Sequence, residues 1–214
     1  MPFATFELPS SLGPVEARPL TPEAFTQFGG VISSIHQLQT MKSIPANYGT
    51  ATKISKVSPI VNNFQNAPSQ RPCTANFNLF RSTYPIKLIQ RTRVRECVYL
   101  SGVLERHPFS TQTFCPMGVP ADEVAYLVIV AETSSDGLPD LKTLKAFVAK
   151  GNQAITYNPG TWHAPMVSLK VVIDFAVLIH ENGVADEDCQ EVYVNPRVPI
   201  SFISATSSTV TAML

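Results

Sequence analysis

Several short stretches of the chain alternate apolar and polar residues, which is the pattern of β-strands with one buried face. The clearest stretch is 171–180, where every second residue from Val171 to Ile179 is apolar. Residues 124–131 instead form a continuous apolar run, which predicts a central strand buried on both faces. Weaker signals predict further strands at residues 75–81, 86–94, 96–105, 146–148 and 151–157.

Helical periodicity is confined to two short stretches. Thr21 is a suitable N-cap for a helix in which Phe25 and Phe28 share one face. Asp140 could cap a single helical turn that runs through Leu144. Many short strands separated by Gly, Pro and Asn turns, with so little helix, indicate a β-sandwich or a β-barrel.

Two regions show neither the alternation of a strand nor the periodicity of a helix. Residues 58–74 are rich in Asn, Pro, Gln and Ser, and we interpret them as a loop insertion, because irregular segments of this length are either functional or poorly ordered. The Ser/Thr-rich tail at 195–214 is expected to be loose or wrapped on a neighbour. The chain has no internal repeat, and we treat residues 1–214 as one domain.

The charge balance argues against a nucleic-acid partner or a membrane partner. Sixteen basic and sixteen acidic residues cancel, and no run of five like charges exists to attract a polyanion or an anionic membrane. Charged residues make up only 15% of the chain, against about 25% on average. Much of the surface is therefore neutral or buried against another subunit, which favours a homo-oligomer.

The cysteines and the chain ends predict a cytoplasmic protein. Four widely spaced cysteines with no C-x-x-C pair argue against a disulfide framework and against a thiolate zinc site. We find no signal-peptide pattern and no apolar stretch near the ~20 residues that span a bilayer. The last three residues, 212–214, only faintly resemble a peroxisomal ending.

The polar residues with the most chemical potential lie in two patches. Glu105 and His107 share one face of an extended strand, which Pro108 ends. A second strand that returns beside the first would bring Gln112 near His107, and a later patch supplies His163. Carboxylate and imidazole groups bind divalent metals well, and an amide oxygen can be a weak fourth ligand. The alternative is that the charged residues lie on the surface and that the histidines have only a packing role. We disfavour it because burying such groups without partners is costly.

The order of these residues resembles the two metal motifs of the cupin barrels. The chain has E-x-H-x4-Q and later P-G-x2-H, where cupins usually have H-x-H with a following glutamate and then P-x-G-x2-H. Glu105 stands at the position of the first histidine and Gln112 at that of the glutamate. The resemblance implies a mainly β, cupin-like double-stranded β-helix or jelly-roll barrel with a few short helices. It also implies one divalent metal ion, of open identity, on Glu105, His107, Gln112 and His163.

Longer motifs resemble the ureidoglycolate lyase family, once called ureidoglycolate hydrolase, in its fungal type. They are E-R-H-P-x3-Q-x-F-x-P-M at 105–117 and G-x-Q-x3-Y-x4-W-H at 151–163, with shorter segments at 19–29 and 139–147. The resemblance runs from about residue 15 to residue 194. It implies a homodimeric carbon–nitrogen lyase of the amidine-lyase type, without an organic cofactor. Such an enzyme eliminates urea from (S)-ureidoglycolate to give glyoxylate in allantoin and purine degradation.

For this small-molecule substrate, the elimination needs a base for the hydroxyl, a proton donor for the leaving nitrogen and a cation for the carboxylate. His163 or Glu105 could be the base, acting directly or by holding a metal that acidifies the hydroxyl. His107 completes the expected catalytic set. Arg81 is our choice for the carboxylate, because a guanidinium can hold it with two hydrogen bonds. The alternative for Arg81 is a surface ion pair.

The urea end of the substrate needs hydrogen-bonding partners. We expect Asn78, Gln112 and the backbone near Gly49, Thr50 and Ala51 to supply them, although the last three could form an ordinary hairpin turn. Two other functions stay open at this point. A non-catalytic cupin-type metabolite-binding protein would bind without consuming its ligand, and a related ureido-compound aminohydrolase would release ammonia rather than urea.

Overall fold

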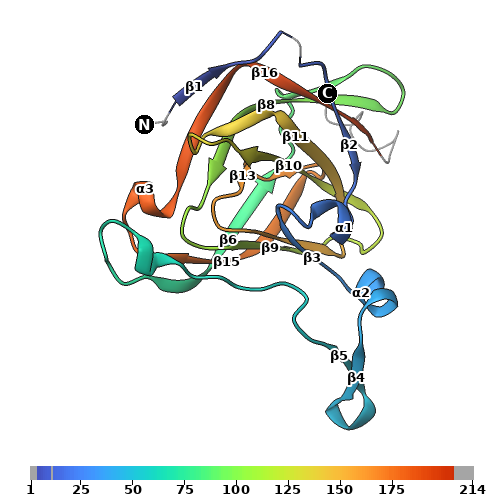
Figure 1. Cartoon of the computed structure of the whole chain (residues 1–214). Helices are drawn as coiled ribbons and strands as arrows, with labels where there is room; N and C mark the ends of the chain where they lie inside the picture. The colour runs from blue at the N-terminus through green and yellow to red at the C-terminus, as the bar shows by residue number, and fades with distance from the viewer. Residues whose placement is uncertain (1–3, 11, 205–214) are drawn as a thin grey trace.

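The computed structural model describes residues 4–10 and 12–204, and its architecture is mainly β (Figure 1). The larger sheet has nine strands in the order β1-β16-β2-β11-β10-β13-β8-β7, with β14 beside β10. Its strands are β1 (Ala4–Glu7), β2 (Val15–Pro19), β7 (Ile89–Arg91), β8 (Glu96–Arg106), β10 (Val124–Thr133), β11 (Pro139–Lys150), β13 (Trp162–His163), β14 (Val167–Ser168) and β16 (Gln190–Ile203). Because β16 pairs with both β2 and β8, these strands close into a barrel. The predicted cupin-like barrel is confirmed.

A five-stranded sheet packs against one wall of this barrel. Its order is β3-β12-β9-β15-β6. The strands are β3 (Gly29–Ser33), β6 (Thr74–Thr83), β9 (Gln112–Met117), β12 (Gln153–Tyr157) and β15 (Val172–Glu181). The predicted apolar face of β15 points toward the barrel, where Phe175 is fully buried and meets Tyr126 edge to face.

Strand β10 separates two hydrophobic cores, which explains its continuous apolar sequence. Leu127 and Ile129 join a core formed with residues of β8, β11 and β16 inside the barrel. Val128 and Val130 point the other way, into a core shared with the five-stranded sheet. A strand with a core on each side has no face left for polar residues. The predicted central strand is therefore confirmed.

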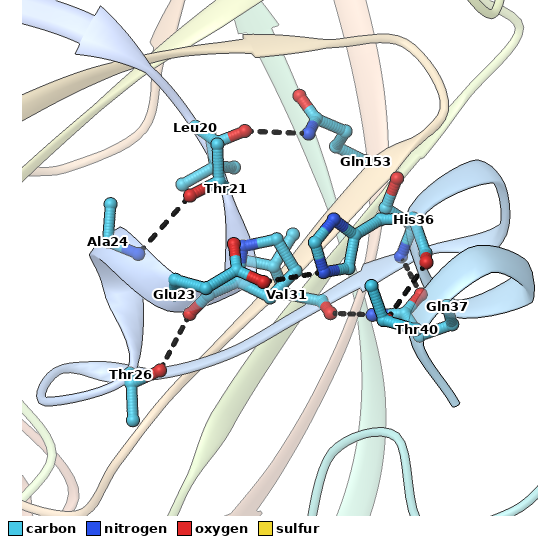
Figure 2. Close-up of polar contacts among 12 residues, drawn as sticks. Leu20, Thr21, Glu23, Ala24, Thr26, Val31, His36, Gln37, Thr40 and Gln153 are labelled. Atoms are coloured by element: carbon cyan, nitrogen blue, oxygen red, sulfur yellow. Dashed lines mark hydrogen bonds and ion pairs between the residues drawn. The ribbon is translucent and has the colours of Figure 1, made fainter. Parts of the chain in front are cut away.

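Helix is limited to short pieces in the described part of the chain: α1 (Pro22–Phe25), α2 (Ser34–Thr40), α3 (Ala185–Asp188) and the 3₁₀ turns η1 (Asn47–Gly49) and η2 (Phe64–Asn66). Thr21 caps α1 as predicted, because its Oγ1 accepts the N–H of Ala24 at 3.2 Å (Figure 2). Among these residues, no helix is long and apolar enough to cross a membrane.

A hairpin of β4 (Ser43–Ala46) and β5 (Ala51–Ile54) projects from the barrel (Figure 1). The two strands pair with each other and with no other strand of the described chain. At the tip, Asn47 and Tyr48 have φ angles of 49° and 54°, and the Tyr48 side chain is fully exposed. The turn predicted at Gly49 is therefore confirmed, and it is exposed to solvent.

The prediction that β9 returns beside β8 is wrong. β9 lies in the other sheet, between β12 and β15. The reason is that both edges of β8 are taken, one by β16 along its length and the other by β13 and β7. After His107 the chain has no free edge to return to, so it crosses to the five-stranded sheet.

The helical turn predicted from Asp140 to Leu144 is also wrong, because these residues lie within β11. Leu141 and Leu144 are both buried three positions apart, which mimics helical spacing. An irregularity in the pairing of β10 with β11 at this point, next to Val130, breaks the period of two.

The tail prediction at 195–214 is wrong for residues 195–203, which belong to β16. Val198, Ile200 and Phe202 alternate into the barrel core and pair with β8. Residues 205–214 lie outside the described part. The predicted insertion at 58–74 is irregular except for η2, a single bridge between Asn62 and Ser110, and Thr74, which begins β6.

Candidate active site

Glu105 and His163 meet at one end of the space between the two sheets. They are register partners on β8 and β13, and His163 is also opposite Val130 of β10. Val130 faces the core shared with the five-stranded sheet, so both polar side chains face the same way. Oε1 of Glu105 lies 3.5 Å from Nε2 of His163, a distance too long for a good hydrogen bond.

His107, directly after β8, and Gln112, the first residue of β9, lie at the two ends of the crossing between the sheets and complete the cluster. The His107 ring centroid lies 5.6 Å from that of His163, and the Gln112 side chain is close enough to favour protonation of His107. Both residues are buried, with 8% and 4% of their surface exposed. The sequence therefore identified four residues that the fold brings together, although the crossing, rather than a hairpin, does so.

Both imidazoles are oriented by backbone carbonyls. Nδ1 of His107 lies 2.6 Å from the carbonyl oxygen of Asp188, and Nδ1 of His163 lies 2.9 Å from that of Thr161. A carbonyl can only accept, so each Nδ1 carries the proton and each Nε2 presents a lone pair. The Tyr157 ring stacks on His163 at 3.8 Å and fixes its plane.

The donor set fits a divalent metal ion. Ligand atoms of Glu105, His107 and His163 all lie within 4.8 Å of one another. Nε2 of both histidines and Oε1 of Gln112 are buried without a hydrogen-bond partner. Buried polar atoms are normally satisfied, so three unpartnered lone pairs in one cluster fit a site for a cation or a proton donor. Histidines that donate Nδ1–H to a carbonyl are also typical of metal ligands.

The protonation states of the cluster at neutral pH suit the binding of a cation. Burial disfavours the charge on Glu105, but His163 and His107 outweigh it, so the pKa of Glu105 lies below its ordinary value. Burial and the neighbouring His163 lower the pKa of His107, against the opposite influence of the Asp188 carbonyl. Glu105 is therefore a carboxylate and His107 a neutral imidazole, the forms that bind metals.

Arg81 is not brought to this cluster within the same chain. It lies on the outer face of the five-stranded sheet, because the adjacent Phe80 packs inward on Phe114. Its guanidinium is held by both carboxylate oxygens of Asp174, each at 2.8 Å, and its side chain is 68% exposed. The arrangement matches the surface ion pair that the sequence left open.

Asn78 lies on the inner face of β6, but its amide is engaged. It donates to the Glu181 carboxylate at 3.2 and 3.3 Å, and Asn76 donates to the same carboxylate at 3.1 Å. Gly49, Thr50 and Ala51 lie at the tip end of the projecting hairpin, away from the barrel of their own chain (Figure 1).

The sequence missed the residues that surround the cluster. Tyr157 was visible only as part of a family motif, and the Asp188 carbonyl has no side-chain signal. Cys189 and Glu191 form a second possible ligand group with Glu105. Burial, aided by Glu105 and Glu191, raises the pKa of Cys189 to about 12, so its thiol stays protonated and this group is the weaker metal site.

A hollow of about 430 Å³ lies elsewhere, between α1, α2 and β3. Its polar side chains satisfy one another (Figure 2): His36 meets Glu23 at 2.8 Å, and Gln37 bonds the backbone of Ser33 and Val31. It contains none of the predicted site residues, and these polar groups are already partnered.

The fold and the cluster define a cupin-like barrel protein with a Glu–His–His site between its sheets. A family model described as Ureidoglycolate lyase matches residues 13–201, so the chain belongs to the ureidoglycolate lyase family. It is 43% identical to the ureidoglycolate lyase of Schizosaccharomyces pombe, over 82% of this chain and 89% of the relative. Identity to the Saccharomyces cerevisiae ureidoglycolate lyase is also 43%, over 83% of this chain and 92% of the relative. A putative ureidoglycolate lyase of Agrobacterium fabrum is 31% identical over 79% and 84%.

Proposed function

We propose that this protein is a ureidoglycolate lyase that converts (S)-ureidoglycolate into glyoxylate and urea. Family membership over most of the chain supports the reaction class. The observation that carries the proposal is the cluster of Glu105, His107, Gln112 and His163, in which Nε2 of both histidines and Oε1 of Gln112 are buried without a hydrogen-bond partner. Neither a nucleophilic serine nor a nucleophilic cysteine is needed for this elimination.

In the proposed reaction the O–H and C–N bonds break while a carbonyl and a new N–H bond form. Glu105 is the proposed base: it is ionised at neutral pH, and its side chain is 18% exposed, against 2% for His163, so it is the easier of the two to reach. The proton taken from the hydroxyl passes to His163 and on to the departing nitrogen, which requires the 3.5 Å gap between Glu105 Oε1 and His163 Nε2 to shorten when the substrate binds. Gln112 supports the urea group through its unpartnered oxygen.

The same residues could hold a divalent ion through Glu105 Oε, the Nε2 atoms of His107 and His163, and Gln112 Oε1. When bound, such an ion would act as a Lewis acid on the hydroxyl and would offset the carboxylate charge of the substrate. Neither Arg81 nor Arg106 supplies that positive charge here. Arg106 points to the opposite face of β8, where its guanidinium lies 4.7 Å from the Trp162 ring. With all four side chains serving as ligands, they would position the hydroxyl rather than carry its proton.

The test is product analysis with purified protein and (S)-ureidoglycolate. We expect urea and glyoxylate in equal amounts. Ammonia in place of urea would identify an aminohydrolase, and calorimetric binding without product would identify a metabolite-binding protein. Elemental analysis of the purified protein, followed by assay after chelation, decides whether a metal takes part.

We also infer that the protein is a homodimer. Phe77 and Leu79 are 74% and 66% exposed on the outer face of β6, an unusual position for two large apolar residues on neighbouring pleats. A second copy of the chain would bury them. Phe77→Asp together with Leu79→Asp should give a monomer by light scattering, and a persisting dimer would exclude this face.

The projecting hairpin supports the same inference. The segment 34–56, which comprises α2 and the hairpin, contains Lys42, Lys53 and Lys56 and no acidic residue. Because the whole chain has a net charge of zero, the rest of the chain carries a net charge of −3. This complementarity favours contact between the hairpin of one copy and the body of another. The proposed substrate contacts of Gly49, Thr50 and Ala51 would then be made in the partner's site. Thr50→Glu should raise KM several-fold by repelling the substrate carboxylate, whereas an unchanged KM would refute this role.

A further inference from the structure

The insertion is fastened to the segment that carries His107. Residues 61–63 run beside 109–111: Asn63 N donates to Phe109 O at 2.6 Å, and Thr111 N donates to Val61 O at 3.1 Å. Asn62 and Ser110 form a bridge between the two segments. The Phe64 ring is buried and lies 5.7 Å from the Phe109 ring. These contacts hold the chain just after His107, where it crosses between the sheets.

The other end of this segment is fastened to α3. Both the N–H and the hydroxyl of Ser69 donate to the Glu187 carboxylate, at 2.7 and 2.6 Å. Asn182 donates to the same carboxylate at 2.6 Å. Glu187 is only 7% exposed, and its hydrogen-bond donors lower its pKa, so it is a buried carboxylate with three donors.

Helix α3 then reaches His107 from the opposite side. Asp188, next to Glu187, presents its carbonyl to Nδ1 of His107 at 2.6 Å. The Asp188 carboxylate accepts the N–H groups of Asn182 and Gly183, each at 2.8 Å, which fixes the turn before the helix. Residues 61–69 therefore connect the two segments that determine where the His107 ring lies and which of its nitrogens carries the proton.

We propose that residues 61–69 are a positioning element for His107, and that Glu187 is the residue through which they act. The proposal rests on the proposed function, because it assumes that His107 serves the reaction. Held by both ends, His107 keeps its Nδ1–H on Asp188 and its Nε2 lone pair in the cluster. Releasing Glu187 lets α3 move and lets the ring change tautomer, although no residue that contacts the substrate has changed.

The first test is the tautomer of His107 in the whole protein. With only four histidines, ¹⁵N-labelled histidine gives a spectrum in which His107→Asn identifies the His107 signals. We expect the wild type to show one neutral tautomer with the proton on Nδ1. Glu187→Gln preserves the side-chain shape but offers one acceptor oxygen instead of two, and it should give a mixture of tautomers. A single unchanged tautomer in this variant, or a wild-type proton on Nε2, would overturn the proposal.

The second test compares kinetics with a matched control. Glu187→Gln should lower kcat about 10–100-fold, as loss of groups that orient a site histidine commonly does. Ser69→Ala should act in the same direction, and Ser69→Thr, which keeps the hydroxyl, should restore most of the loss. Ser168→Ala removes another hydroxyl that bonds a carbonyl, that of Lys170 at 2.8 Å, at a fully buried residue on β14. It should lower Tm but leave kcat and the His107 signals unchanged.

These outcomes separate the two proposals. A lower Tm in Glu187→Gln with unchanged kcat would show a purely structural role and refute the positioning. Absence of urea release by the wild type would refute the proposed function, while the histidine spectra would still test the effect of Glu187 on His107.

Discussion

Two groups of ionisable residues have opposite surroundings in the fold. Arg81 and Asp174 lie on the outer face of a sheet, and each satisfies the other through two hydrogen bonds. Glu105, His107 and His163 lie between the sheets, and two of their nitrogen atoms have no partner. The comparison teaches that unused hydrogen-bonding capacity in a buried place, rather than charge itself, marks the site.

Replacing His163 should have the largest effect. His163→Ala removes the group that returns a proton to the leaving nitrogen, or one ligand of a bound ion, and kcat should fall about 10²–10⁴-fold. Circular dichroism should show an intact fold, because the substitution leaves both cores in place. A kcat near that of the wild type would end the assignment of the cluster as the active site.

Glu105→Gln should have the next largest effect. The amide keeps the shape and one oxygen but cannot take a proton, so kcat should fall about 10²-fold. If the cluster holds a divalent ion, the metal content by elemental analysis should fall as well. A loss of metal with a smaller loss of kcat would indicate that Glu105 serves as a ligand and not as the base.

Arg81→Ala should change little. An exposed ion pair contributes little to stability, so Tm should fall by no more than about 2 °C, and kcat/KM should change less than about threefold. Asp174→Ala is the matched variant from the other side of the pair. A large rise in KM for Arg81→Ala alone would place its guanidinium in a substrate site, which in this fold would have to belong to another subunit.

The smallest effect is the pH dependence of that pair. Hydrogen bonds and charge from Arg81 lower the pKa of Asp174 in the folded state. Its contribution is therefore present above the ordinary carboxyl pKa near 4 and is lost as the pH falls through the lower folded value. The Tm difference between the wild type and Asp174→Asn should shrink over that window. A Tm difference that grows as the pH falls would contradict a lowered pKa of Asp174 in the folded state.

Period and residue type predicted much of the fold. The apolar face of β15 and the apolar run of β10 depend on local alternation, and both are confirmed. Local alternation does not say which strands pair, so the sequence placed β9 beside β8. The pairing depends on which edges are free, and that is a property of the whole sheet. An irregularity in β11 gave two leucines a helical spacing, and no local rule distinguishes the two cases.

The candidate site was predictable in its side chains and not in its supports. Glu105, His107, Gln112 and His163 were identified because their types suit metal and proton chemistry. Arg81 was chosen by the same chemical argument, but a strand has two faces and only the packing of Phe80 decides which one faces inward. The Asp188 carbonyl orients His107 through the backbone, and every residue has such a group. Sequence reasoning could not have singled it out.

Strand β10 is a shared wall, and this ties the chemistry to residues that never meet the substrate. Trimming Ile129 inside the barrel would let the wall relax, and His163 is paired with the neighbouring Val130 on that same strand. Attempts to re-engineer the barrel interior should therefore be screened for turnover as well as for thermal tolerance. Sequence changes in the barrel core are therefore limited by the need to keep His163 in position on the other side of β10.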